Sequence, residues 1–277
     1  MNAASSIDLD RYQSYADDRT RFDELLPGVL RLTLCAPRRW NALHIAFHDA
    51  LPRLFAEIAE DAQVRAFVLA AEGEVFSSGG DVGEGLRERH VGELVNVHRV
   101  ATRIVTRLLE VPQPTVCIVN GPAIGFAASL ALHCDFVIAA SEASFRDSHT
   151  AFGVVPGDGL VLVMMNALGP ALAREVLLAG RELSAGEAER YGLVNRVVPR
   201  EQLEESAVEL ITRVLAQAPL AVRLGKMLIN TRLRADAEGL LNLAMAAELV
   251  TMTSEDYRAA VKGFEADGRF KQDWQAR

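Results

Sequence analysis

Short apolar runs alternate with amphipathic stretches over the first two-thirds of this chain, whereas the last third is amphipathic throughout. Apolar runs bounded by turn residues are typical of buried strands, and apolar residues spaced three or four apart are typical of helices. Strands are predicted at residues 29–34, 64–71, 115–119, 135–140 and 194–198. Strands that alternate with helices favour an α/β core, here followed by a helical appendage.

Each predicted helix carries one apolar face. The first begins at Asn41, and we expect Pro52 to kink it because proline removes a backbone hydrogen bond. Ser184 and Glu187 form the pattern of a capping box at the start of another helix. Further helices are predicted at residues 92–109, 124–133, 201–216, 220–232, 235–251 and 254–266.

No linker rich in Ser, Pro or charge divides the chain. We therefore assign residues 1–200 to an α/β core with a polar N-terminal arm, and residues 201–277 to a C-terminal helical region. A chain of 277 residues, 50% of them hydrophobic, can bury a sizeable core. Its net charge of −8 argues against nucleic acid as a partner.

The N-terminal arm is polar and lacks the apolar segment of a secretory signal. Residues 111–134 carry no charge, but prolines and a turn cut them into pieces too short to span a bilayer. We therefore expect a cytoplasmic protein without a membrane partner. The cysteines lie in apolar runs and are predicted to be reduced, buried thiols: Cys35, Cys117 and Cys134.

Several cofactor and nucleophile signatures are absent from the sequence. It contains no Gly-x-Gly-x-x-Gly, no P-loop, no Gly-x-Ser-x-Gly and no Cys-x-x-Cys. His44 and His48 stand four residues apart on a predicted helix but lack a third ligand, so we expect no metal site.

Two glycine-rich turns are candidates for binding an oxyanion through backbone N–H groups. Residues 78–81 (Ser-Gly-Gly-Asp) follow a buried strand, and the turn at 120–122 (Asn-Gly-Pro) leads into a helix that starts among small residues. The first amides of a helix have no intrahelical partner, and the helix dipole favours negative charge there. A plain turn and tight helix–sheet packing are the alternative interpretations.

His149 lies in a loop ahead of the glycine-rich residues 153–159. An imidazole titrates near neutrality and can move a proton, and Asp158 could orient it as the carboxylate of a catalytic triad does. A surface loop histidine, and a helix N-cap role for Asp158, would leave the same pattern.

Taken together, these segments resemble the crotonase (enoyl-CoA hydratase/isomerase) superfamily. The matching segments are residues 36–43, 75–81, 114–125, 145–159 and 179–188. The resemblance implies a spiral of ββα units with a C-terminal helical trimerisation region, assembled as a homotrimer or a dimer of trimers. It also implies an acyl-CoA thioester as substrate, with no separate cofactor.

The resemblance implies that the backbone N–H groups of Gly80 and Phe126 form the oxyanion hole. Phe126 stands where the family usually has glycine, so its side chain must find room. The implied substrate-binding residues are Arg38, Trp40, Ser78 and Asp81.

The departures from the family concern its two catalytic glutamates, because Ser129 and His149 occupy those positions. The spacing of His149 and Asp158 resembles a subgroup that includes β-diketone hydrolases of the oxocamphor hydrolase type. Glu248 also matches those hydrolases, whereas Phe126 replaces their oxyanion-hole histidine. We expect Ser129 and Glu248 to be secondary polar groups.

The leading hypothesis is an enzyme that acts on an acyl-CoA through an enolate, with His149 moving a proton or activating water and Asp158 orienting it. A retro-Claisen hydrolase of a β-diketone is the first alternative. A non-catalytic scaffold that has lost both glutamates is the second.

Overall fold

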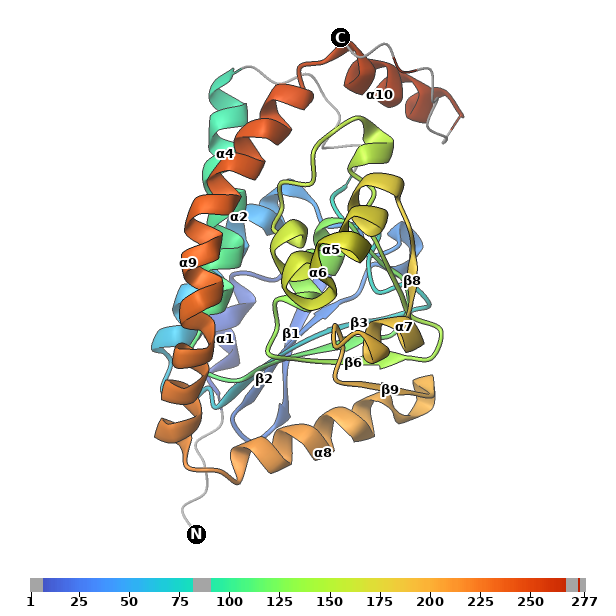
Figure 1. The fold of residues 1–277 in the computed structure, drawn as a ribbon. Helices are drawn as coiled ribbons and strands as arrows, with labels where there is room; N and C mark the ends of the chain where they lie inside the picture. Colours follow the sequence, from blue (N-terminus) through green and yellow to red (C-terminus); the bar gives the residue numbers. More distant parts are fainter. Residues whose placement is uncertain (1–6, 82–90, 268–273, 275–277) are drawn as a thin grey trace.

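The computed structural model describes residues 7–81, 91–267 and 274 (Figure 1). Its main sheet has the strand order β1-β2-β3-β4-β6-β9. The strands are β1 (Thr20–Leu26), β2 (Val29–Leu34), β3 (Ala66–Ala71), β4 (Thr115–Val119), β6 (Phe136–Ala140) and β9 (Arg196–Val198). β1 and β2 form an antiparallel hairpin, and the other neighbours are parallel. This confirms the predicted α/β core.

A second sheet of three short strands changes the predicted start of one helix. It consists of β5 (Ala123–Ile124), β7 (Ser144–Arg146) and β8 (Leu183–Ser184). Because residues 123 and 124 pair with β7, the helix predicted from residue 124 begins two residues later, as α5 (Phe126–Leu132). Phe126 thereby becomes the first residue of that helix.

The other helices surround these sheets. They are α1 (Leu9–Gln13), α2 (Ile45–Glu60), α4 (Val91–Glu110), α6 (Leu160–Ala179), α7 (Ala185–Arg190), α8 (Leu203–Leu215), α9 (Pro219–Thr251) and α10 (Glu255–Asp267). Short 3-10 turns are η1 (Pro37–Arg39), η2 (Thr150–Phe152) and η3 (Arg200–Gln202). The capping box of Ser184 and Glu187 is confirmed at the start of α7.

One prediction about helix breaks was wrong. The helices predicted at 220–232 and 235–251 are one helix, α9, because no Gly or Pro separates them. α2 continues through Pro52, so the proline does not end that helix. A break does occur within α6, where Gly169 has φ +68° and ψ +170° ahead of Pro170.

The core lies between the main sheet and the helices that cover it. α8 packs beneath the sheet, and α9 runs alongside α4 (Figure 1). All three cysteines are free thiols, with Cys117 and Cys134 buried and Cys35 half-buried.

An ion pair between a buried lysine and a half-buried aspartate attaches α9 to the core. Lys226 Nζ lies 2.7 Å from Asp135 Oδ2 and donates to the Gln113 carbonyl over 2.9 Å. Asp135 also accepts hydrogen bonds from the Thr115 backbone N–H and hydroxyl, over 2.7 and 2.9 Å. The carboxylate therefore joins the start of β4 to the N-terminal part of α9.

We predict that Asp135→Ala destabilises the protein, because it leaves the ammonium of Lys226 buried without its counter-ion. Removing one partner of a buried pair of this kind costs about 3 kcal/mol of unfolding free energy, measured by urea unfolding. Asp236→Ala, which removes an exposed ion pair with Arg232 on the same helix, should change it by less than about 0.5 kcal/mol. Equal losses for the two variants would contradict the anchoring role.

Candidate active site

Two loops that are far apart in the sequence lie against each other at the candidate oxyanion hole. Ser77 and Ala123 form a parallel bridge, and the Ile124 N–H donates to the Ser77 carbonyl over 3.1 Å. Gly79 has φ +89°, and a Cβ there would lie 2.6 Å from the Ile124 carbonyl oxygen and 3.7 Å from the Phe126 nitrogen. Only glycine fits this contact, so the two predicted donor segments adjoin.

The first loop leaves the Gly80 amide available. The neighbouring amides of Ser77, Ser78, Gly79 and Asp81 donate to carbonyl or hydroxyl oxygens 2.8–3.3 Å away. No described residue accepts a hydrogen bond from the Gly80 N–H. A network that fixes its neighbours while leaving one amide free is suited to presenting that amide to a ligand oxygen.

The Phe126 amide is available for a different reason. As the first residue of α5 it has no intrahelical acceptor, and Gly125 before it has no side chain to cap the helix. Within the described part of the chain its N–H donates to no residue. The phenyl ring packs edge-on against His48, with ring centroids 4.5 Å apart, and is 8% exposed. The phenyl ring of Phe126 is thus accommodated against His48 of α2.

His149 lies beside the start of α5, because a Cβ on Gly125 would be 3.7 Å from its Cε1. Both carboxylate oxygens of Asp147 contact His149. Oδ1 accepts the His149 backbone N–H over 2.9 Å, and Oδ2 lies 2.9 Å from the ring nitrogen Nδ1. The Asp147 side chain is fully buried. This contact fixes the orientation of the imidazole and places its Nδ1 proton on the Asp147 side.

Sequence reasoning missed Asp147 and assigned the orienting role to Asp158. An aspartate that bonds the backbone two residues later is a common turn pattern, and Asp147-Ser148-His149 carries that signal. Asp158 lies on the opposite side of the ring, with Oδ2 3.7 Å from His149 Nε2. That separation is an ion-pair distance, longer than a hydrogen bond.

Asp158 also lies at the start of α6, where its Oδ1 accepts the Leu160 N–H over 3.0 Å. Its carbonyl oxygen accepts the hydroxyl of Ser129 over 2.8 Å. Ser129 is fully buried and therefore holds the Asp158 backbone in place.

Glu248 reaches the same cluster from α9. A Cβ on Gly157 would lie 2.2 Å from Glu248 Oε2, so the carboxyl group packs directly on the glycine backbone. Glu248 is 8% exposed, and its Oε2 has no hydrogen-bond partner among the described residues. Burial raises the pKa of Glu248 to about 7, against the opposing effect of His149.

The carboxyl groups determine the charge of the imidazole. Burial would lower the pKa of His149, but the charges of Asp158 and Asp147 outweigh it and raise the pKa to about 10. Burial also raises the pKa of Asp158, an effect that the imidazolium opposes. The cluster therefore keeps His149 protonated at neutral pH.

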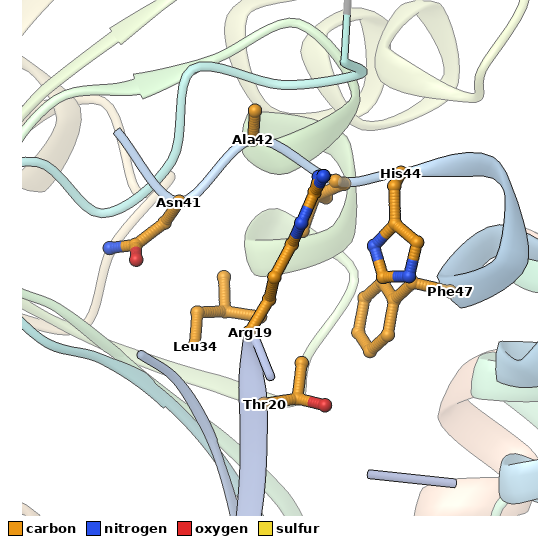
Figure 2. Close-up of a pocket in the computed structure, with 8 residues that line it drawn as sticks. Arg19, Thr20, Leu34, Asn41, Ala42, His44 and Phe47 are labelled. Atoms are coloured by element: carbon orange, nitrogen blue, oxygen red, sulfur yellow. The ribbon is translucent and has the colours of Figure 1, made fainter. Parts of the chain in front are cut away.

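The four predicted substrate-binding residues lie near the first loop. Arg38 and Trp40 are exposed, on and just after η1, and the Trp40 carbonyl accepts the N–H of half-buried Ser78 over 2.9 Å. Asp81 forms an ion pair with Arg19 over 2.9 Å. Arg19, which sequence reasoning did not single out, lines a small cavity beside these segments (Figure 2).

The fold is that of the crotonase superfamily. A crystal structure of an enoyl-CoA hydratase/isomerase from Pseudoalteromonas atlantica matches with a TM-score of 0.80 and 29% identity, over 91% of this chain and 98% of that one. The family model for Enoyl-CoA hydratase/isomerase matches residues 24–276. The chain belongs to the enoyl-CoA hydratase/isomerase family.

Proteins that act on CoA thioesters are among its relatives. The short-chain-enoyl-CoA hydratase of Clostridium acetobutylicum is 30% identical over 237 residues, covering 85% of this chain and 90% of that protein. The 1,2-epoxyphenylacetyl-CoA isomerase of Escherichia coli is 31% identical over 246 residues, covering 86% and 92%.

We predict opposite protonation states for two histidines in one NMR spectrum. His149 should remain an imidazolium at pH 8, whereas His133, whose pKa burial lowers to about 4, should be neutral at pH 6. Nitrogen-15 imidazole shifts, assigned with His→Gln variants, measure both. Because the folded pKa of His149 is raised, its protonation stabilises the fold below about pH 6.5, and this contribution declines as the pH rises towards 10. A midpoint near 6.5 for His149 would contradict the assignment.

Proposed function

We propose that this protein acts on an acyl-CoA thioester through an enolate whose oxygen accepts hydrogen bonds from the Gly80 and Phe126 amides. The observation that carries the proposal is a pair of backbone N–H groups, on adjoining loops, that donate to none of the residues described. Amides aimed at a developing oxyanion in a water-poor site lower the barrier without reorganising during the reaction. Family membership and CoA-thioester relatives support the substrate class.

The protonated imidazole of His149 suits a proton donor better than a base. An imidazolium between Asp147 and Asp158 can deliver a proton to the carbon next to the thioester or to a leaving oxygen. Glu248, with its pKa near 7, is the group of the cluster that is poised to accept a proton at neutral pH. Two groups with separated pKa values can act as a pair, one as general acid that donates a proton and the other as general base that accepts one.

Hydration by two glutamates is excluded for this chain, since Ser129 carries no carboxyl group and its hydroxyl is committed to the Asp158 carbonyl. We infer that this single group of charged residues, rather than a glutamate pair, carries out the proton transfer. Water addition, elimination of water and double-bond isomerisation all remain compatible with such a group.

The test compares wild type with His149→Gln and Asp147→Asn on a panel of enoyl-CoA thioesters. Removing the general acid should lower kcat by about 10²–10⁴-fold. Asp147→Asn should lower kcat less and shift the pH profile towards lower pH, because it removes one charge that keeps the imidazole protonated. His98→Gln, at a half-buried position of α4 outside the cluster, is the matched control. Unchanged kcat in His149→Gln would remove this residue from the mechanism, whereas loss of all turnover in that variant would exclude a non-catalytic scaffold.

The second candidate is a retro-Claisen hydrolase that cleaves a β-diketone. The observation that favours it is the cluster of His149, Asp158 and Glu248 in place of a glutamate pair. The same oxyanion hole would hold the departing enolate while the acid–base cluster activates water at the other carbonyl.

Binding of coenzyme A separates the two candidates. For an acyl-CoA enzyme we expect saturable binding of free CoA by calorimetry, and Arg38→Gln should raise KM about fivefold at unchanged kcat because it removes uniform binding. Turnover of a cyclic β-diketone without measurable CoA affinity would instead favour the hydrolase.

A further inference from the structure

Asp81, the residue that follows Gly80, forms a partly buried ion pair with Arg19. Arg19 Nη1 lies 2.9 Å from Asp81 Oδ2, and the two side chains are 13% and 22% exposed. Figure 2 shows the Arg19 side chain extending from the start of β1 toward the segment that carries Ala42. A residue of the N-terminal hairpin thus reaches the candidate oxyanion loop, 62 positions away in the sequence.

The backbone of Arg19 is itself fixed. Its N–H donates to Asp17 Oδ1 over 2.8 Å, and its carbonyl accepts the Cys35 N–H over 2.8 Å. The guanidinium is therefore attached to the β1–β2 hairpin through a short, anchored stretch of chain.

Gly80 is bracketed by contacts on both sides. The Gly79 carbonyl accepts the Leu43 N–H over 2.8 Å, and the Asp81 N–H donates to the Leu43 carbonyl over 2.8 Å. These two bonds use the residues on either side of Gly80, so its own N–H points away from Leu43. The ion pair adds a third restraint, on the side chain of Asp81, that limits rotation about the backbone just after Gly80.

We propose that Arg19 is a positioning residue, which fixes the direction of the Gly80 N–H through the carboxylate of Asp81. The inference rests on the proposed function, because the direction of this amide affects catalysis only if it binds the enolate oxygen. An oxyanion donor must lie about 2.7–3.1 Å from the oxygen, so a small rotation of the loop weakens it. The carboxylate of Asp81 then serves the loop rather than the substrate.

The kinetic test uses Arg19→Gln and Asp81→Asn. Each should lower kcat about 10–100-fold with KM within about twofold, since an interaction made mainly in the transition state is lost. Arg19→Lys should restore part of kcat, and the double variant should lose less than the two single losses combined, because both substitutions break the same contact. A rise in KM at constant kcat for Asp81→Asn would instead make Asp81 a substrate-binding residue and overturn the proposal.

A spectroscopic readout separates positioning from a loss of stability. The probe is 4-dimethylaminocinnamoyl-CoA, whose absorption moves to longer wavelength when its thioester carbonyl is polarised. Arg19→Gln should bind the probe with a clearly smaller shift than wild type. The matched control is Arg31→Gln: Arg31 lies in the same hairpin, is 16% exposed and pairs with Asp23 and Glu204, and this variant should keep the full shift.

The outcomes separate the role of Arg19 from the existence of the oxyanion hole. A wild-type protein that binds the probe without any shift would count against the proposed oxyanion hole. A wild-type shift that persists in both Arg19→Gln and Asp81→Asn would overturn the role of Arg19 alone. If Arg19→Gln does not fold, the shift in Asp81→Asn decides the question.

Discussion

The parallel contact between Ser77 and Ala123 is the interaction on which the candidate site depends. β3 and β4 are parallel neighbours, so the chain leaves both at the same edge of the sheet, where ligands of α/β proteins commonly bind. The bridge joins the loops that follow these strands, and the glycine at position 79 lets their backbones touch. Two amides that donate to no described residue are therefore brought together by strand order and by the missing Cβ of one residue.

The charged cluster poses the opposite physical problem, since buried charges are costly unless they are paired. Here one imidazolium lies between Asp147 and Asp158. The third acid, Glu248, has a raised pKa, so it carries a buried negative charge less often. The carboxyl group of Glu248 needs space against the backbone, and Gly157 provides it because any Cβ there would clash with Oε2. Ser129, where the resemblance implied a catalytic glutamate, contributes a hydroxyl that donates to the Asp158 carbonyl and holds the backbone there.

Much of the fold could be predicted from the sequence, because strands such as residues 115–119 and the capping box at Ser184 are encoded by nearby residues. The pair β5–β7 could not, since two residues carry no periodicity and their partner lies about twenty positions away. The donors at Gly80 and Phe126 came from the family resemblance. Arg19 was not predicted because its partner Asp81 is 62 positions away in the sequence. Asp147 could have been predicted, since an aspartate two residues before a histidine is a common turn pattern.

The unbroken course of α9 has a consequence for how this chain can vary. Lys226 is fixed to the core near one end, and Glu248 enters the cluster 22 residues later, about 33 Å along the helix axis. Inserting or deleting one residue between them would turn the carboxyl group by about 100° and carry it about 1.5 Å along the axis. Homologous chains that retain the glutamate should therefore conserve the number of residues between the positions of Lys226 and Glu248, even where the intervening residues differ.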